Sequence, residues 1–195
     1  MFENRKKQIV KKLNEAIRDG KVDYSIIDHL LKINEFEDIY TTSSCAGRVI
    51  VLVDRGGKKY SFFAGKWHDF VNSEEIWSKI IQYSNEKLVW LKQEPFILHI
   101  ICKKLRDAVK IIRIARDVGF KHSGIISMKK ERIVCEINGI DRVEIPVIID
   151  GKIIINKEYL NNLVNYINFK LSRNKTLREE FFKRIFDYLS NKSKS

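Results

Sequence analysis

The sequence predicts an α+β fold in which a mixed or mainly antiparallel sheet has helices on one face, with further helices at both ends of the chain. Two features lead to this prediction. Near both ends, apolar residues recur every three or four positions, as in amphipathic helices. In between, short runs rich in Val, Ile and Phe alternate with turn residues, as in antiparallel strands. With 195 residues, 44% of them hydrophobic, the chain can bury a core. We therefore expect one domain over 1–190 and a flexible tail over 191–195.

The N-terminal part is expected to form two helices. Apolar residues make one stripe of a first helix over 2–19, which Gly20 ends. Asp23 is placed to cap a second helix, which ends near Asn34.

The middle of the chain is expected to alternate pairs of strands with helices. The expected strands are 39–42, 47–54, 59–63, 88–92, 96–101, 125–128, 132–137, 142–149 and 152–155. A hairpin turn at 55–58 joins two of them, and Ser73 is placed to cap a helix. The clearest helix runs over 103–118, with Leu105 and Val109 on its predicted buried stripe.

Turn and helix signals also organise the C-terminal part. Asp150-Gly151 is a strong signal for a two-residue hairpin, and Pro146 places its strand at an edge or at a bend because proline donates no hydrogen bond. Two helices over about 157–172 and 176–189 are expected to finish the chain, the second capped by Thr176. This order of elements suits a duplicated β-β-α unit.

The net charge of +12 and the pI of about 9.6 are a strong clue to the partner. A positive field attracts polyanions, so nucleic acid is the first candidate and an anionic membrane the second. No apolar run approaches the length of a membrane span, and no signal peptide follows the basic N-terminus. Three widely spaced cysteines do not suit a disulfide framework. We therefore expect a cytoplasmic protein that does not enter a membrane.

The polar segment Thr41–Arg48 interrupts an otherwise apolar stretch. Its four consecutive hydroxyls and its thiol are suited to binding a polar molecule. Gly47 permits close approach of a backbone, and Arg48 offers a planar fork of donors for phosphate or carboxylate. The alternative is a polar strand and turn in which the hydroxyls only cap the backbone.

Histidines mark two further candidate positions. In Lys66-Trp67-His68, the aromatic ring can stack on a base, the lysine can hold a phosphate, and the histidine can exchange protons near neutral pH. The alternative is a tryptophan tucked under a loop with His68 hydrogen-bonded beside it. His99 shares a strand face with apolar residues, so it is either a satisfied core histidine or a group aimed into a pocket.

Two other basic segments complete the set of candidates. Lys121–Gly124 brings together a cation, an imidazole, a hydroxyl and a glycine. Arg106, Lys110 and Arg113 line one side of the helix over 103–118, where they track a nucleic-acid backbone or form a solvated face.

The sequence lacks the fingerprints of several common enzyme classes. No Gly-x-Gly occurs, which excludes the dinucleotide-binding fingerprint and leaves no Walker loop. Zinc-ligand spacing, the Gly-x-Ser-x-Gly elbow and the deaminase signature are also missing. If the three polar segments converge, they form a cationic pocket that admits a nucleic-acid base.

Five motifs occur in a fixed order along the chain: Ser43–Arg48, Lys66–His68, Glu94–His99, Gly119–Gly124 and Arg142–Pro146. Together they resemble the tRNA wybutosine-synthesising methyltransferases of the third pathway step, over roughly residues 1–190. Members of that family often have serine after the motif cysteine, whereas this chain has Ala46, which puts a role for that hydroxyl in doubt.

The resemblance implies transfer of a methyl group from S-adenosylmethionine to the N4 nitrogen of a wyosine-type, guanosine-derived base beside the anticodon of tRNA(Phe). It also implies a fold other than the Rossmann arrangement. A non-catalytic tRNA-binding protein with the same basic surface is the competing interpretation.

Under this resemblance each candidate residue has a hypothetical role. The general base would be His68 or His99. The residues expected to bind the cofactor are Ser43, Ser44, Cys45, Gly47, Ser123 and Gly124. The residues expected to bind tRNA or its base are Arg48, Lys66, Trp67, Lys121, Arg142 and Glu144. No metal is expected.

Overall fold

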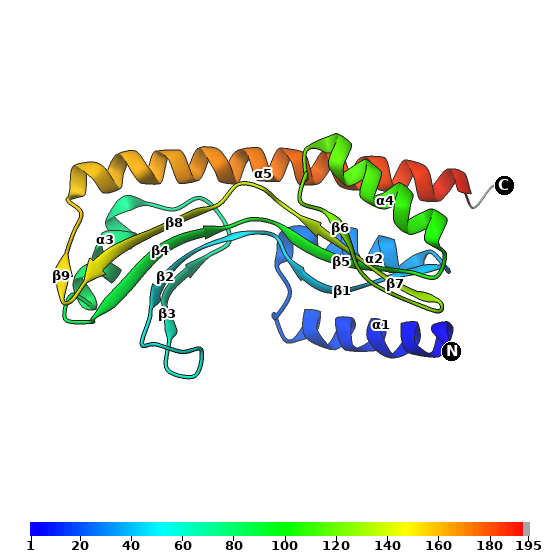
Figure 1. The fold of residues 1–195 in the computed structure, drawn as a ribbon, viewed down its shortest axis with the longest axis horizontal. Helices are drawn as coiled ribbons and strands as arrows, with labels where there is room; N and C mark the ends of the chain where they lie inside the picture. The colour runs from blue at the N-terminus through cyan, green and yellow to red at the C-terminus, as the bar shows by residue number, and fades with distance from the viewer. Residues whose placement is uncertain (193–195) are drawn as a thin grey trace. The chain divides into compact units, whose positions relative to one another are not determined.

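A computed structural model describes residues 1–192 and divides the chain into two compact units (Figure 1). Unit 1 consists of Met1–Ala46, Phe96–Ile140 and the part of the chain from Lys175. Unit 2 consists of Gly47–Pro95 and Asp141–Asn174. The long C-terminal helix α5 (Lys157–Lys192) contributes its first half to unit 2 and its second half to unit 1.

Unit 1 contains a four-stranded antiparallel sheet in the order β1-β5-β7-β6. Its strands are β1 (Ile39–Cys45), β5 (Ile97–Cys102), β6 (Gly124–Lys129) and β7 (Arg132–Asn138). Its other elements are α1 (Phe2–Arg18), the 3-10 turn η1 (Tyr24–Ile26), α2 (Ile27–Glu35), α4 (Leu105–Val118) and the second half of α5.

Apolar side chains are buried on both faces of the unit 1 sheet. On one face, Leu98 and Ile100 of β5 pack with residues of α2, α4 and α5 in the largest core cluster. On the other face, Ile101 packs with Tyr40 and with Phe2 of α1. Since residues of one strand point alternately to the two faces, both sides of β5 carry apolar residues.

Unit 2 contains a five-stranded antiparallel sheet in the order β3-β2-β4-β8-β9. Its elements are β2 (Arg48–Val53), β3 (Phe62–Trp67), α3 (Ser73–Gln82), β4 (Leu88–Glu94), β8 (Val143–Ile149), β9 (Lys152–Ile153) and the first half of α5. Alternate strand residues such as Val49, Val51 and Leu91 form its core with α3 and α5. These two helices lie on one side of the sheet (Figure 1).

The structure confirms the predicted fold class and several of the signals that ended elements. The fold is α+β with antiparallel sheets, and it is not a Rossmann arrangement. Gly20 ends α1 with a φ of 64°, and Asp150-Gly151 forms the β8–β9 hairpin with φ angles of 49° and 72°. The ladder between β4 and β8 shifts register next to Pro146, as expected of a strand that bends there.

The predicted ranges 157–172 and 176–189 are both helical, but the predicted break between them was wrong. Residues 157–192 form the single helix α5, so Thr176 lies inside it and not at a helix start. The expected tail over 191–195 overlaps this helix at Asn191 and Lys192, and residues 193–195 lie outside the described part. The prediction also did not anticipate that the strands form two sheets.

Several local predictions need correction. The Asp23 side chain does not cap a helix, and Asn72, not Ser73, caps α3 by accepting a hydrogen bond from the Glu74 backbone N–H. On the predicted buried stripe of α4, Ala108, Ile112 and Ala115 are buried as expected, whereas Leu105 and Val109 are exposed, because Ile111 and Ile114 complete the buried face.

Among the helices of residues 1–192, none combines sufficient length with sufficient apolarity to cross a membrane.

Candidate functional site

The segment expected to be a polar loop is mostly strand. β1 continues through Thr41, Ser43 and Ser44 to Cys45, and only two residues separate it from β2. Thr41 pairs with Ile100 and Ser44 pairs with Leu98, so the two intervening residues of β1 oppose a single residue of β5. This β-bulge bends the strand and re-aims its side chains. The residue that it opposes is His99.

His99 lies in a polar row that crosses the unit 1 sheet. The bulge residue Ser43 is on one side of it, Glu136 of β7 is paired with it on the other, and Gly124 of β6 is paired with Glu136. The Nε2 atom of His99 is 2.9 Å from a carboxylate oxygen of Glu136, and both side chains are about three-quarters buried. We call Ser43, His99, Glu136 and Gly124 the His99 row.

The contact with Glu136 determines which nitrogen of His99 can accept a proton. An ionised carboxylate is only an acceptor, so the Nε2 atom must carry the hydrogen and the Nδ1 atom carries the lone pair. The carboxylate also stabilises the imidazolium that forms when a proton arrives. This contact leaves Nδ1 as the accepting nitrogen of the neutral ring, and Glu136 was not among the predicted site residues.

The other predicted residues of unit 1 differ in their accessibility. Ser43 and Lys121 are exposed, and Ser44 is half-buried. A Cβ built at Gly124 would meet no atom within 4 Å, so there is open space above that end of the His99 row. Ser123 is fully buried, and its Oγ accepts a hydrogen bond of 3.1 Å from the Asn138 N–H. That placement favours a structural role for Ser123 over the predicted contact with a cofactor.

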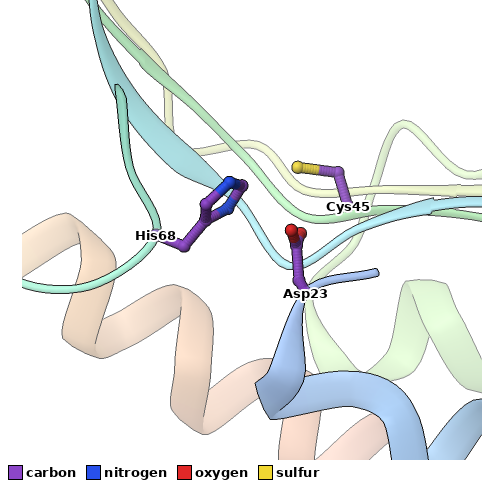
Figure 2. Close-up of side chains that lie close together, drawn as sticks. All are labelled: Asp23, Cys45 and His68. Atoms are coloured by element: carbon purple, nitrogen blue, oxygen red, sulfur yellow. The ribbon is translucent and has the colours of Figure 1, made fainter. Parts of the chain in front are cut away.

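Two buried contacts of unit 1 hold the residue that follows β1. The Ala46 N–H donates to the Asp23 carboxylate at 2.6 Å, and the Ala46 carbonyl accepts from the buried Arg178 at 3.2 Å. Figure 2 shows Asp23 and Cys45, whose carboxylate oxygen and Sγ lie within 4.8 Å of each other. The Ala46 side chain is itself buried in the main core cluster, so a hydroxyl is not needed there for solvent or ligand contact.

His68, also drawn in Figure 2, belongs to unit 2. Its ring is exposed, and its Nδ1 atom lies 3.2 Å from the carbonyl oxygen of Gly47. A carbonyl only accepts, so the Nδ1 atom carries the hydrogen, and in a neutral ring the Nε2 atom would be the acceptor. His68 and His99 are therefore both held by an acceptor at one nitrogen, His68 by a neutral carbonyl and His99 by a carboxylate.

Lys66 and Trp67 were predicted to lie in a loop, but both belong to the strand β3. Neighbouring residues of a strand point to opposite faces. Trp67 packs against the unit 2 core, with its ring over Gly65, whereas Lys66 is exposed. This arrangement favours the alternative in which Trp67 is a packed residue with a hydrogen-bonded His68 beside it.

Arg48 and Glu144 are both engaged in ion pairs. The Arg48 Nε donates to Glu94 at 2.6 Å, and the Arg48 guanidinium lies 5.0 Å from the centre of the Phe63 ring. Glu144 pairs with Lys92 of the neighbouring strand. Arg142 precedes β8 and is exposed.

The predicted site residues thus divide into two sets. Unit 1 holds Ser43, Ser44, Cys45, His99, Lys121, Ser123 and Gly124. Unit 2 holds Gly47, Arg48, Lys66, Trp67, His68, Arg142 and Glu144. A hollow of about 830 Å³ between α1 and α2 contains none of these residues in its lining.

The model of a protein family described as Methyltransferase TYW3 matches residues 4–187. This chain belongs to that family. The TYW3 methyltransferases are enzymes, so the chain is a methyltransferase, in agreement with the resemblance seen in its motifs.

Curated relatives and solved structures agree with the family assignment. This TYW3 chain is 38% identical to a protein of Thermococcus sibiricus, covering 89% of each sequence, and 37% identical to one of Methanocaldococcus jannaschii, covering 92% of this chain and 94% of the relative. Both are named tRNA(Phe) 7-((3-amino-3-carboxypropyl)-4-demethylwyosine(37)-N(4))-methyltransferase.

Among solved structures, the PH1069 protein from Pyrococcus horikoshii is similar with a TM-score of 0.87 and 35% identity, covering 94% of this chain and 95% of that one. A hypothetical protein from Aeropyrum pernix is similar with a TM-score of 0.73 and 27% identity, covering 84% of this chain and 96% of that one.

Proposed function

We propose that this TYW3 methyltransferase transfers a methyl group from S-adenosylmethionine to the N4 nitrogen of a wyosine-type base beside the anticodon of tRNA(Phe). The observation that carries this proposal is that relatives aligned over about nine-tenths of the chain have names that specify this base, this nitrogen and this tRNA. The net charge of +12 supports a polyanionic substrate.

The reaction needs alignment and the removal of one proton. The bond between the methyl carbon and the sulfonium sulfur breaks, a bond between that carbon and the base nitrogen forms, and the nitrogen loses a proton. Because the sulfonium is already a good leaving group, the enzyme contributes mainly by positioning the reactants and by accepting this proton.

His99 is the histidine best arranged to accept the proton. Its Nδ1 atom is the acceptor, and Glu136 fixes the ring and stabilises the imidazolium. His68 is the second candidate, since Gly47 holds it in the opposite tautomer with Nε2 as the acceptor. The difference lies in the partner, because a carbonyl stabilises an imidazolium less than a carboxylate does.

The exposed end of the His99 row suits the polar parts of the methyl donor. The donor has hydroxyls, an ammonium and a carboxylate, which need hydrogen-bond donors and acceptors. Ser43 and Ser44 supply hydroxyls at the bulge, Gly124 leaves open space, and the exposed Lys121 precedes it. These residues would hold the donor while His99 receives the proton.

Incubation of the pure protein with labelled S-adenosylmethionine and hypomodified tRNA(Phe), followed by nucleoside analysis, tests the proposal. We expect label in a wyosine-type nucleoside and not in the four unmodified ones. Calorimetric titration with S-adenosylmethionine separates the enzyme from a non-catalytic tRNA-binding protein, which would bind tRNA in a salt-dependent manner and show no affinity for the donor. The latter result would contradict the proposed function.

Single substitutions test which histidine is the general base. His99→Ala is expected to lower kcat by about a hundredfold or more, because general bases contribute typically 10²–10⁴-fold. Glu136→Gln is expected to have a smaller effect and to change the pH profile of kcat, because it alters the partner of His99 without removing the ring. If His99→Ala keeps full turnover and His68→Ala loses it, the base is His68; if both keep it, neither histidine is the base.

A further inference from the structure

The sheet of unit 2 has two faces, and among the described residues the helices of that unit, α3 and the first half of α5, pack on only one of them. The core residues Val49, Val51, Leu91 and their neighbours point toward α3 and α5. The residues between them in sequence point to the opposite side. We call this side, marked by Arg48, Phe63, Lys66, Trp90, Lys92 and Lys152, the open face.

Strand pairing arranges the open face in two parallel rows. One row is Lys66, Ile50, Lys92 and Glu144, each paired with the next across β3, β2, β4 and β8. The adjacent row is Phe63, Leu52, Trp90 and Pro146 across the same four strands. In the first row, charged side chains flank the buried Ile50, and the adjacent row consists of aromatic and apolar side chains.

Some cations on this face are held in place by the protein itself. Lys92 pairs with Glu144 and lies 5.0 Å from the centre of the Trp90 ring. Arg48 pairs with Glu94 and lies 5.0 Å from the centre of the Phe63 ring. These contacts brace the aromatic rings between charged neighbours, while Phe63 remains 47% exposed.

Other cations at this face have no carboxylate partner. Within residues 1–192, Lys66 and Lys152 take part in no ion pair, and both are exposed. Lys152 pairs with Ile149, which pairs with Leu88 of β4, so Lys152 lies on the same face as Trp90 and Lys92. The face thus offers unneutralised positive charge next to an exposed aromatic ring.

We infer that the open face binds single-stranded RNA, with unpaired bases stacked on Phe63 and the edge of Trp90 and phosphates held by Lys66 and Lys152. Sheet surfaces that combine aromatic rings with cations bind single strands in this way, because every base has a face to stack and every linkage a charge to neutralise. A duplex offers no unstacked base, so a loop or an extended strand suits the face better. The inference rests on the proposed function, in which the substrate is the looped anticodon region of a tRNA.

Paired substitutions test the open face by equilibrium binding to hypomodified tRNA(Phe) and to oligouridine. Phe63→Ala is expected to weaken both affinities about tenfold, because the variant loses the stacking contact between this ring and one base. Phe169→Ala, which removes a more exposed ring from α5, is the matched control and should leave both unchanged. Binding to polyphosphate, which has no bases, should be insensitive to Phe63→Ala.

Charge substitutions give a second, independent readout. Lys66→Gln and Lys152→Gln are each expected to reduce the slope of log affinity against log salt by about 0.7 for a single strand. Lys183→Gln, at an exposed position of α5, is the matched control. If Phe63→Ala and both lysine variants behave as their controls do, or if the unaltered protein binds neither RNA, the open face is not the RNA surface.

Methyl transfer distinguishes this inference from the function on which it rests. Phe63→Ala should raise KM for tRNA and leave kcat at saturating tRNA unchanged. If the Phe63 and lysine variants of the open face lose RNA affinity while the unaltered protein shows no methyl transfer, the RNA surface is supported and the proposed reaction is contradicted. If the protein methylates tRNA and all variants match their controls, the reaction stands and the RNA surface fails.

Discussion

Neighbouring strands of the sequence, β4 and β5, belong to different units and are buried in different ways. Along β4 the burial alternates strictly, with Val89, Leu91 and Gln93 inside and the residues between them partly exposed. Along β5, Ile100, Ile101 and Cys102 are consecutively buried. A strand with one open face has polar side chains in contact with solvent on that face. A strand covered on both faces has polar groups only where a ligand or a partner can compensate their burial. His99 is such a group.

The largest expected difference between the units is in unfolding free energy, when one apolar side chain is shortened on the second face of each sheet. Ile101→Ala should cost about 4 kcal/mol of unfolding free energy, since Ile101 is fully buried against Phe2 and Tyr40. Leu52→Ala, on the open face, should cost about 1 kcal/mol because less area returns to water. Urea denaturation measures both. Equal losses would mean that the two second faces are covered alike.

Within residues 1–192, each unit has one buried aspartate, and the two aspartates have different partners. Asp107 of unit 1 contacts the Lys192 Nζ at 2.5 Å and the Tyr188 hydroxyl at 2.7 Å. Asp141 of unit 2 contacts two cations, Lys170 at 3.2 Å and Arg173 at 3.3 Å. Burial and the hydrogen bond to Asp107 raise the pKa of Tyr188 to about 12, which keeps its hydroxyl a donor.

Removing one cation beside Asp107 and one beside Asp141 should therefore lower the unfolding free energy by unequal amounts. Lys192→Met should cost about 3 kcal/mol, because it leaves a fully buried carboxylate without this cation. Lys170→Met should cost about 1 kcal/mol, since Arg173 still faces Asp141. Thermal unfolding of the two variants measures the difference. Similar losses would show that Asp107 is compensated by other groups.

Two strand glycines provide a smaller test, one in each unit. A Cβ at Gly65 would lie 2.2 Å from the Cη2 atom of Trp67, so Gly65→Ala should cost about 2 kcal/mol and alter tryptophan fluorescence. A Cβ at Gly124 meets nothing within 4 Å, so Gly124→Ala should change stability by less than about 0.5 kcal/mol. The same variant should raise KM for S-adenosylmethionine. An unchanged KM would place the donor away from Gly124.

The smallest expected effect is a pH dependence confined to unit 1. Burial against Phe182 lowers the pKa of His29 from its usual 6.5, although Glu179 acts in the opposite direction. The unfolded state then binds a proton more readily than the folded state does. The stability of unit 1 is therefore complete above pH 6.5 and declines as the pH falls below that value.

Hydrogen exchange of α2 and β5 amides between pH 7.5 and 5.5 measures this decline, and His29→Phe should abolish it. All three tryptophans lie in unit 2, so tryptophan fluorescence serves as the internal control and should stay constant. Equal acid sensitivity of both signals would assign the titration to a group other than His29.

The sequence was most informative where structure is local. The helix α1, the Asp150-Gly151 hairpin and the alternation of β4 follow from periodicity and turn chemistry alone. His99 was identified as a candidate, but its partner Glu136 lies 37 residues away, and nothing in the sequence indicates that β5 and β7 are neighbours. The contacts of Ala46 with Asp23 and Arg178 span 23 and 132 residues, so they were also beyond local reasoning.

The helix α5 shows why a correct rule produced a wrong boundary. Its inward-facing stripe continues from the half-buried Leu171 through the buried Asn174 and Arg178 to the buried Phe181. Because the two middle positions are polar, the apolar pattern seemed to stop and restart, which predicted two helices. No glycine or proline breaks the stretch, so the backbone had no reason to leave the helix.

The division of the chain between the units has a consequence for its synthesis. Neither unit is one continuous stretch, because each combines early segments with part of α5. During translation, the core of unit 2 stays incomplete until residue 174 has left the ribosome. The core of unit 1 stays incomplete for longer, because it needs Phe181 and Ile185. Folding of both cores is therefore postponed to the last stage of translation, and a nascent chain stalled before α5 would expose two unfinished sheets to chaperones and proteases.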